Sequence, residues 1–578
     1  MNDLRSSEGF MTTWDQTRLY YRAWIPPVPT RKAVVLFHRG HEHSGRFHEL
    51  VQDLDLKDFA FFAWDARGNG NSPGRRDYAD NFSVYVKDAD TFVNFISEQH
   101  RIPVENMVVL AHSVGGVIAG TWVHDYAPPV KALILATPAF RIRLYLPFAI
   151  PLLRWAQKIN ALKVVPSYVK AKVLTHDPDQ IQKYNEDPKI TKSISTNILL
   201  DAHDTSARII ADAGAIRVPT LLLGAGSDWV VKLSSQKKFF ERLSSSIKEM
   251  KVYPSFYHAV FHEKDRHLPI AKVREFILRV FRNHSARPPL IDADKAGYTK
   301  SEFDRLTKPK RSLRLGFQRF MANTLGRLSL GMRLGWRSGF DSGATLDYVY
   351  ANKAQGITAL GRLIDCVYLN SPGWKGIRQR KAHLEKLIRA TAERVSMAGK
   401  SVRLLDIAAG PGRYILETMK ELEKIPIVAL LRDNTEANLE AGRKLARELN
   451  VSKATFTQGD AFDRKSLASV SPKPTIAVVS GLYELFPDNE RVLDSLRGLS
   501  EAVEEGGYLI YTNQPWHPQL EVIARVLINR EGKPWIMRRR SQEEMDDLVR
   551  SVGFEKTDME IDQWGIFTVS VARRRAGA

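Results

Sequence analysis

Cysteine is almost absent from this sequence: Cys366 is the only one among 578 residues. A single cysteine excludes an intramolecular disulfide and fits a reducing compartment. Nothing around Cys366 indicates an activated thiolate, so we expect it to be a small buried residue.

Long hydrophobic runs are also missing. A membrane-spanning helix needs roughly 18 to 20 apolar residues, and the longest candidate here, 144–153, is about half that length and contains two prolines. The N-terminal residues lack the apolar core of a secretory signal. We therefore expect a cytoplasmic protein that can lie on the cytoplasmic face of a membrane without crossing it.

Acidic residues are fewer than basic ones: 65 Asp and Glu against 85 Lys and Arg give a formal net charge of +20. This excess favours an anionic partner, which can be a nucleic acid, an acidic substrate or a lipid surface. The length indicates about two to four domains.

The first half alternates apolar β-type runs with helical patterns up to about residue 284. Continuous apolar runs such as "AVVLFH", "MVVLAH" and "TLLLG" are typical of parallel strands covered on both faces. Between 139 and 216 the alternation gives way to a helical, basic stretch. We therefore predict an α/β domain over 1–284 with an insertion over its sheet.

A serine hydrolase pattern lies within this domain. "MVVLAHSVGGVIAG" predicts a strand, a sharp turn at Ser113 and a helix, although Ala111 stands where the pattern G-x-S-x-G has a glycine. Asp228 and His258 each follow a later strand. The order Ser113, Asp228, His258 is the α/β-hydrolase order, in which serine attacks, histidine takes the proton and aspartate orients the imidazole.

These segments, together with "TRLYYRAWIP", "HRGHEHSGRF" and "WDARGNGNS", resemble the monoacylglycerol lipase and lysophospholipase branch of the α/β-hydrolases. The resemblance implies a serine ester hydrolase acting on a lipid ester. It also implies an oxyanion hole from the backbone N–H groups of Gly40 and Val114, and a helical lid over about 139–216. Arg39, in place of a usual glycine, and Ala111 are departures that leave open an inactive fold with a structural Ser113.

Other histidines of this half admit two interpretations. His41, His43 and His112 suggest a metal, but they recur in the family motif without one, so we expect packing residues and no metal. His262, four residues after His258, is an alternative base that departs from the motif. Loop residues Glu42 and Arg46 are expected to form a structural ion pair.

The second half contains a nucleotide-type turn. "VRLLDIAAGPGRY" predicts a strand, a glycine-rich turn and a helix, and Ile415 at the third glycine position disfavours NAD. Asp433 ends a second predicted strand, where a carboxylate suits ribose hydroxyls, and Asp460 follows a third. A Rossmann-like domain without a cofactor, or with another nucleotide, remains an alternative.

The segments from about 341 to 575 resemble class I S-adenosylmethionine-dependent methyltransferases. The whole chain resembles a bacterial group in which a lipase-like hydrolase is fused to a methyltransferase-like domain. For a domain over 344–578, the resemblance implies S-adenosylmethionine as methyl donor and the following contacts. Asp406, Gly410 and Gly412 would line the methionine end, Asp433 would hold the ribose, and Asp460 would lie near the adenine.

The methyl acceptor is less defined. "SGLYELF" stands where methyltransferases of base or glutamine amino groups carry [DNS]-P-P-[YFW], which disfavours a nucleic acid as partner. Tyr483, Glu484 and His517 are candidates to touch the acceptor, and Tyr483 and His517 could equally be packing groups.

Residues 285–343 form a basic connector. Between 308 and 337 there are eight Lys and Arg residues and no Asp or Glu, interleaved with Leu, Phe, Met and Trp at helical spacing. This pattern predicts a helix on an anionic membrane surface, with Phe317, Phe320 and Trp336 on its apolar face. Helices packed between the two domains, or contact with RNA or DNA, are the alternatives.

Together these features predict a bifunctional α/β protein that hydrolyses a lipid ester and methylates a lipid-linked or small acceptor. The alternatives are an inactive hydrolase domain that serves as a lipid-binding platform, and a nucleic-acid methyltransferase with a hydrolase passenger. The acyl chain, the methyl acceptor and the oligomeric state are left undetermined.

Overall fold

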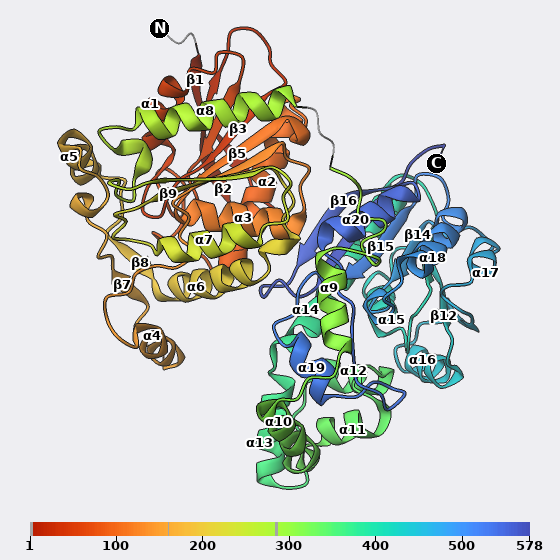
Figure 1. Ribbon diagram of the computed structural model, residues 1–578. Coiled ribbons are helices and arrows are strands. Elements are labelled where there is room, and N and C mark those ends of the chain that lie inside the picture. The colour runs from red at the N-terminus through yellow and green to blue at the C-terminus, as the bar shows by residue number, and fades with distance from the viewer. Residues whose placement is uncertain (1–3, 160, 284–286, 578) are drawn as a thin grey trace. The chain divides into compact units, whose positions relative to one another are not determined.

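The chain folds into two separate units, and the continuous apolar runs of the first half form the central strands of one sheet. The computed structural model describes residues 4–159, 161–283 and 287–577, and the chain forms two compact units, Met1–Arg287 and Pro288–Ala578 (Figure 1). Most of the segment predicted as a connector thus belongs to the second unit.

The first unit has an eight-stranded sheet with the order β1-β2-β4-β3-β5-β6-β9-β10. From β4 to β10 neighbouring strands are parallel, whereas β1 and β2 are antiparallel additions at one edge. The central strands are fully buried, as their apolar sequences predict. The strands are β1 (Arg5–Thr12), β2 (Arg18–Ile25), β3 (Ala33–Phe37), β4 (Ala60–Trp64), β5 (Met107–His112), β6 (Ala132–Ala136), β9 (Thr220–Ala225) and β10 (Lys248–Tyr253).

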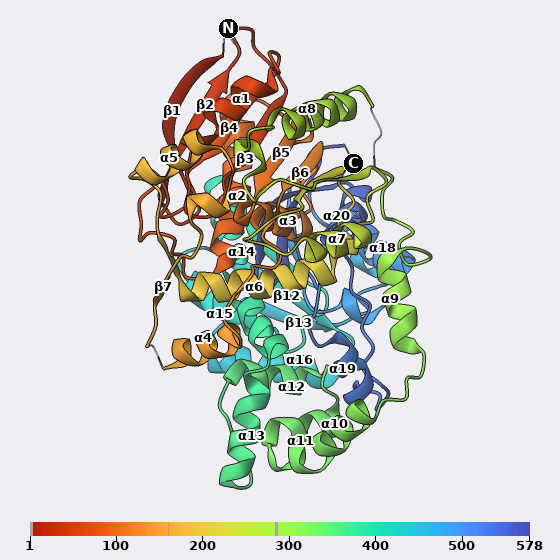
Figure 2. The same cartoon turned by 60° about the vertical axis from the view of Figure 1, so that its left-hand side comes forward.

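Helices cover both faces of this sheet. α1 (His48–Leu54) packs with α8 (His267–Arg282) on one face, and α2 (Phe82–His100), α3 (Val114–Tyr126) and α7 (Leu233–Arg242) lie on the other. The predicted insertion lies between β6 and β9. It contains α4 (Ala149–Lys158), β7 (Val164–Pro166), α5 (Pro178–Glu186), β8 (Ser193–Ser195) and α6 (Thr196–Ala211). In both views α4 lies apart from the sheet (Figure 2).

The second unit has a seven-stranded sheet with the order β13-β12-β11-β14-β15-β17-β16. Strands β11 to β15 are parallel, β17 is antiparallel to β15 and β16, and the strand order reverses between β11 and β14. The α/β fold class predicted for both halves is confirmed. The strands are β11 (Val402–Asp406), β12 (Ile427–Asp433), β13 (Ala454–Gln458), β14 (Ile476–Val479), β15 (Tyr508–Asn513), β16 (Phe554–Ile561) and β17 (Thr568–Arg574).

The helices of the second unit fall into two groups. Those that accompany the sheet are α14 (Pro372–Met397), α15 (Arg413–Glu421), α16 (Glu436–Glu448), α17 (Arg464–Ala468), α18 (Asn489–Ala502), α19 (Leu520–Val526) and α20 (Gln542–Ser551). Those that precede it are α9 (Tyr298–Thr307), α10 (Leu313–Asn323), α11 (Leu330–Ser338), α12 (Gly343–Ala351) and α13 (Ala359–Leu369).

Two predictions about this helical region are wrong. Cys366 lies exposed on α13, because the buried side of that helix is formed by Gly361, Asp365 and Leu369. Trp336 does not share the exposed face of Phe317 and Phe320: it is partly buried in an apolar cluster. In the described ranges, no helix has the length and apolarity needed to span a bilayer.

Candidate functional site

Ser113 lies at a sharp turn between β5 and α3. Its backbone has φ 54° and ψ −115°, an unusual conformation for a non-glycine residue. The turn requires glycine at 115, because a Cβ there would lie 2.5 Å from the carbonyl oxygens of Phe37 and His38. Ala111 is buried within regular β5 with no positive φ, so its methyl group does not disturb the turn.

The structure brings Ser113, Asp228 and His258 together, as their order in the chain predicts. His258 Nε2 lies 2.8 Å from Ser113 Oγ, and His258 Nδ1 lies 2.8 Å from Asp228 Oδ2. All three are buried. With the proton on Nδ1 directed to the carboxylate, Nε2 is left to accept a proton from the serine hydroxyl.

Asp228 remains a carboxylate despite its burial. Burial alone would raise its pKa, but the neighbouring His258 and the backbone N–H groups of Val231 and Val230 outweigh this effect and lower the pKa below its usual value. Both N–H groups donate to Oδ1, at 2.9 and 2.7 Å. Asp228 can therefore hold the imidazole with its other oxygen.

Two residues that sequence reasoning did not connect to the site fix the backbone of His258. His112 Nε2 lies 3.1 Å from the His258 carbonyl oxygen, and Thr137 Oγ1 donates to the same oxygen at 2.9 Å. Burial lowers the pKa of His112 well below its usual value, so His112 is a neutral donor. Thr137 follows β6 and had no signal in the sequence.

The loop after β3 places Gly40 against Val114. A Cβ on Gly40 would lie 3.2 Å from Val114 Cγ2. The Val114 N–H begins α3 and has no intrahelical acceptor.

Arg39 has no positive φ, so a non-glycine residue fits this loop without strain. Its guanidinium donates two hydrogen bonds to Glu42, both 2.6 Å. Glu42 also lies 3.4 Å from Arg46 Nε, so the predicted ion pair is present as part of a larger cluster.

The remaining histidines have structural partners. Burial lowers the pKa of His262 to about 3, and its Nε2 lies 3.3 Å from the Arg46 carbonyl oxygen, away from Ser113. His41 lies 2.8 Å from Asp77, and His43 lies 2.8 Å from Asp187. No cluster of metal-ligating side chains is present in the part of the chain that the structure describes.

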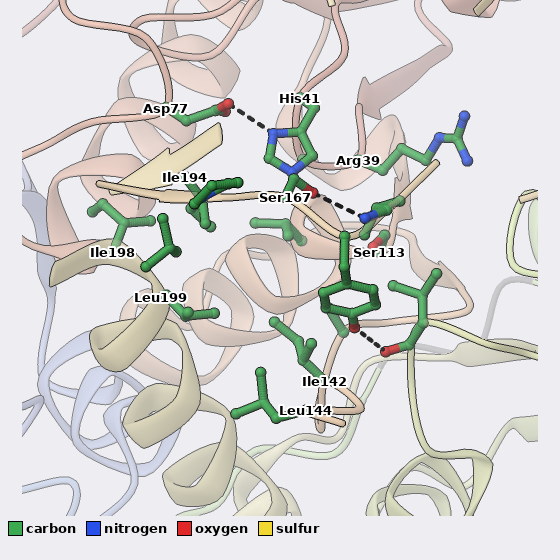
Figure 3. A pocket seen from close by; sticks show the side chains of 18 of the residues that line it. Arg39, His41, Asp77, Ser113, Ile142, Leu144, Ser167, Ile194, Ile198 and Leu199 are labelled. Carbon is green, nitrogen blue, oxygen red and sulfur yellow. Dashed lines mark hydrogen bonds and ion pairs between the residues drawn. The ribbon is translucent and has the colours of Figure 1, made fainter. Parts of the chain in front are cut away.

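Ser113 and His258 open onto a cavity of about 650 Å³ (Figure 3). Gly40, Val114 and His41 also line it, and its remaining walls come largely from the insertion. These walls are apolar, and their lining residues include the aliphatic side chains of Ile142, Leu144, Ile194, Ile198 and Leu199. Several large apolar side chains of the insertion are more than half exposed: Tyr145, Leu146, Phe148, Leu152, Trp155 and Ile159.

In the second unit, the predicted cofactor residues lie at the carboxyl ends of neighbouring strands. Asp433, at the end of β12, accepts hydrogen bonds from the Gly410 and Thr435 N–H groups, both at 2.9 Å. Gly410 has φ 55° and open space where a Cβ would project. Asp460 is exposed after β13, where its carboxylate accepts a hydrogen bond from the Phe462 N–H.

Asp406 is fully buried at the end of β11. Burial raises its pKa to about 7, although a hydrogen bond from the Tyr414 hydroxyl at 2.6 Å opposes this shift. Gly412 has φ 70°, and a Cβ there would lie 2.1 Å from Leu431.

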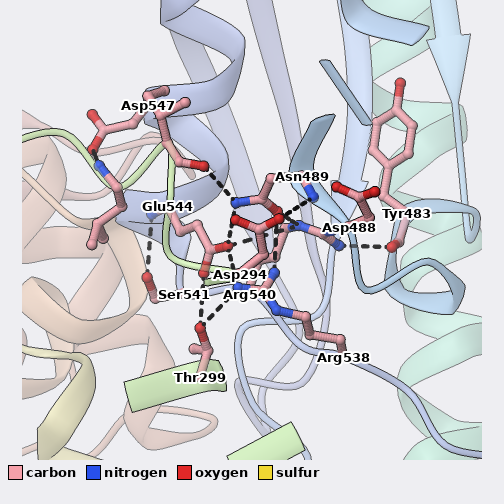
Figure 4. A network of polar contacts seen from close by, with 12 residues as sticks. Asp294, Thr299, Tyr483, Asp488, Asn489, Arg538, Arg540, Ser541, Glu544 and Asp547 are labelled. Atoms are coloured by element: carbon pink, nitrogen blue, oxygen red, sulfur yellow. Dashed lines mark hydrogen bonds and ion pairs between the residues drawn. The ribbon is translucent and has the colours of Figure 1, made fainter. Parts of the chain in front are cut away.

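The three acceptor candidates have different surroundings. Tyr483 is buried, and its hydroxyl shares a hydrogen bond of 3.0 Å with Ser495 Oγ. Glu484 and His517 both line a second cavity. The turn that carries Glu484 is held by a buried arginine network that the sequence did not reveal (Figure 4).

Comparisons with known proteins agree with this division. Residues 28–265 match the family described as "Serine aminopeptidase, S33", and residues 273–574 match the family described as "Putative methyltransferase". The uncharacterized protein YnbC of Escherichia coli K12 is 48% identical over 577 residues, which is 98% of each chain.

Several relatives that match the first unit alone are lipases by name. A monoacylglycerol lipase of Mycolicibacterium smegmatis is 28% identical over 270 residues, covering 45% of this chain and 93% of the lipase. The crystal structure of a monoacylglycerol lipase from Paleococcus ferrophilus aligns with 45% of this chain and 99% of its own, at 24% identity and a TM-score of 0.41. Because the match to the family described as "Putative methyltransferase" spans more than half of the chain, the chain belongs to that family, and it carries an α/β-hydrolase domain ahead of that family's domain.

Proposed function

We propose that the first domain is a serine hydrolase of lipid carboxylic esters. The observation that carries this proposal is the continuous chain of contacts from Asp228 through His258 to Ser113 at the wall of a large apolar cavity. Ser113 is the nucleophile, His258 the general base and Asp228 the group that orients it.

The proposed reaction uses only groups of this chain. His258 Nε2 takes the Ser113 proton as Oγ attacks the ester carbonyl, and the oxyanion that forms is stabilised by the N–H groups of Gly40 and Val114. His258 then gives the proton to the leaving alcohol, and water hydrolyses the acyl-enzyme by the same route.

The cavity indicates the substrate class. Its volume of about 650 Å³ and its apolar walls suit one acyl chain with a small head group, as in a monoacylglycerol or a lysophospholipid. The exposed apolar residues of the insertion would meet a lipid surface, which fits the role of a lid that guides acyl chains inward. The names of the lipase relatives support the same class.

Hydrolysis of p-nitrophenyl butyrate tests this proposal. Ser113→Ala should lower the rate by about 10³-fold or more and abolish labelling by a fluorophosphonate probe. Ser234→Ala, an exposed serine on α7, is the matched control and should change neither. An unlabelled wild type, or equal rates in wild type and Ser113→Ala, would favour the inactive lipid-binding platform instead.

We further propose that the second domain uses S-adenosylmethionine, which supplies an electrophilic methyl group when bound. The residues present fit this group. Gly410 leaves space for a ligand above the loop. The Asp433 carboxylate can accept further hydrogen bonds from ribose hydroxyls, because a carboxylate has about four acceptor sites. Asp406 and Gly412 would line the methionine end, with Asp460 near the adenine.

Calorimetry with S-adenosylmethionine on the full chain tests this assignment. Asp433→Ala should weaken binding at least tenfold, since it removes the ribose contacts, whereas Asp494→Ala on α18 should bind as the wild type does. A thermal melt of each variant separates loss of the site from loss of the fold. Preference of the wild type for NAD would contradict the proposal.

We also propose that helix α10 and its basic neighbours bind an anionic membrane. Leu313, Phe317 and Phe320 are 96%, 65% and 62% exposed on α10, which has no buried residue. The surrounding segment, 308–337, contains Lys and Arg without Asp or Glu. Exposed apolar groups among cations match the acyl region and the phosphates of an anionic bilayer.

A further inference from the structure

The second cavity, of about 200 Å³, lies where the parallel strands of the second sheet end. Gly481, just beyond β14, and Gln514, just beyond β15, line it. β14 pairs with β11, whose end leads into the loop that contains Gly410. Ligands of open α/β sheets bind at such strand ends, beside the point where the strand order reverses.

Aromatic rings form one wall of this cavity. Trp374 stacks on Trp535 with ring centroids 6.2 Å apart and an interplanar angle of 27°, and Tyr368 meets Trp374 edge-on at 5.6 Å. Phe567 lies under Arg380, 4.9 Å from the guanidinium carbon. A small cavity with such a wall favours a flat ligand of one or two rings.

One corner of the cavity holds a carboxylate and a guanidinium, whose opposite charges cancel. Glu484 Oε1 lies 3.4 Å from Arg380 Nη1, and the two residues are 8% and 3% exposed. A charged ligand would leave a net buried charge beside this pair, so the corner suits a neutral one. Within the described residues, Glu484 Oε2 has no hydrogen-bond partner although it is buried. That oxygen needs a donor, which a ligand can supply.

The position of Glu484 is fixed by its backbone. The Arg538 N–H donates to the Glu484 carbonyl at 3.0 Å. The buried Arg540 guanidinium donates to the carbonyls of Tyr483 and Phe486, at 2.7 and 2.8 Å (Figure 4). Three hydrogen bonds thus hold the turn, and Glu484 is held in place before any ligand binds.

His517 offers the complementary donor. Its Nδ1 accepts a hydrogen bond from the Gln519 N–H at 3.0 Å, so the ring proton is on Nε2. Burial lowers the pKa of His517 to about 4, which keeps the ring neutral. Both side chains line the cavity, and a hydroxyl is a group that can donate to a carboxylate and accept from an imidazole N–H.

We propose that this cavity binds the methyl acceptor, and that the acceptor is a neutral aromatic compound of one or two rings that carries a hydroxyl group. This inference rests on the methyltransferase function proposed above. The hydroxyl oxygen forms the new O–CH₃ bond, the donor's C–S bond breaks with its electron pair left on sulfur, and the hydroxyl proton passes to Glu484 Oε2. Glu484 is then the catalytic base, and the aromatic wall positions the ring.

Binding of 1-naphthol to the full chain, measured by calorimetry without methyl donor, tests the cavity by itself. The wild type should bind 1-naphthol at least tenfold more tightly than 1-methoxynaphthalene, which lacks the proton that Glu484 accepts. Trp535→Leu should weaken 1-naphthol binding at least tenfold. Equal binding of the two compounds, or no binding of either, overturns the inference.

Methyl transfer to 1-naphthol, followed by mass spectrometry of the ether product, tests the role of Glu484. Glu484→Gln keeps an acceptor oxygen, so KM should change less than threefold while kcat falls at least 100-fold. Glu490→Gln, an exposed glutamate on α18, is the matched control. An unchanged kcat in Glu484→Gln overturns its role as base.

These outcomes separate the two proposals. A wild type that binds S-adenosylmethionine but not 1-naphthol overturns the acceptor site and leaves the methyltransferase proposal in place. A wild type that does not bind S-adenosylmethionine overturns the methyltransferase proposal, and with it the assignment of this cavity to an acceptor.

Discussion

Replacing Asp228 with Asn should reverse the protonation of His258 with little change in the fold. The N–H groups of Val230 and Val231 both donate to Asp228 Oδ1, at 2.7 and 2.9 Å, so the oxygen of an asparagine would keep that place. Its NH₂ group would then face His258 Nδ1. Two donors cannot face each other, so the imidazole would carry its proton on Nε2 and could not accept the proton of Ser113.

In such a site the wrong tautomer lowers kcat by about 10⁴-fold, which corresponds to about 5.5 kcal/mol of activation free energy. Initial rates with p-nitrophenyl butyrate at neutral pH measure the loss. Asp179→Asn, an exposed aspartate on α5, should keep the wild-type rate. If Asp228→Asn melts as the wild type does and keeps more than a tenth of the activity, the proposed role of Asp228 is refuted.

Three further predictions concern the second unit. Because burial raises the pKa of Asp406 from 3.8 to about 7, its contribution to stability is present below about pH 4 and is lost as the pH rises through 7. Asp406→Asn should remove this part of the pH dependence in thermal melts between pH 5 and 9, and an unchanged dependence would contradict it. Phe317→Ser with Phe320→Ser should weaken the salt-resistant part of binding to phosphatidylglycerol vesicles in flotation, without lowering the melting temperature, because both side chains are exposed. Replacing four arginines of this segment should release the protein from phosphatidylglycerol vesicles at low salt, since each cation near an anionic surface contributes about 1 kcal/mol to binding. Flotation that does not depend on lipid charge would count against the membrane proposal. The residues to replace with Gln for this test are Arg314, Arg319, Arg327 and Arg333.

The sequence predicts well those features that local patterns determine. The apolar runs of β3, β5 and β9 predict a buried parallel sheet. The order of Ser113, Asp228 and His258 along the chain, each after a strand, predicts that these three side chains meet. The contacts of Thr137 with the His258 carbonyl depend on where two distant loops meet, which no local pattern records. Predictions from helical spacing were less successful, as Trp336 shows.

The buried arginines illustrate a second limit. The run "RRRS" at 538–541 has the composition of an exposed basic loop, yet Arg538, Arg539 and Arg540 are 1%, 2% and 1% exposed. They are buried because carboxylates and carbonyls surround them, among them Glu544, close by in the chain, and Glu302 from the distant helix α9. A count of Lys and Arg therefore overstates how many cations reach the surface of this chain, since these three arginines are buried inside the second unit.

Helix α4 has a consequence for how the first domain would meet its substrate. It has no buried residue, and Leu152 and Trp155 on it are 54% and 62% exposed to water. Removing such side chains from water is favourable only against another apolar surface. A lipid aggregate offers such a surface and would stabilise the conformation in which α4 is covered, whereas isolated lipid molecules would not. The hydrolase would then respond to the physical phase of its substrate as well as to its concentration, and its rate would follow the area of lipid–water interface.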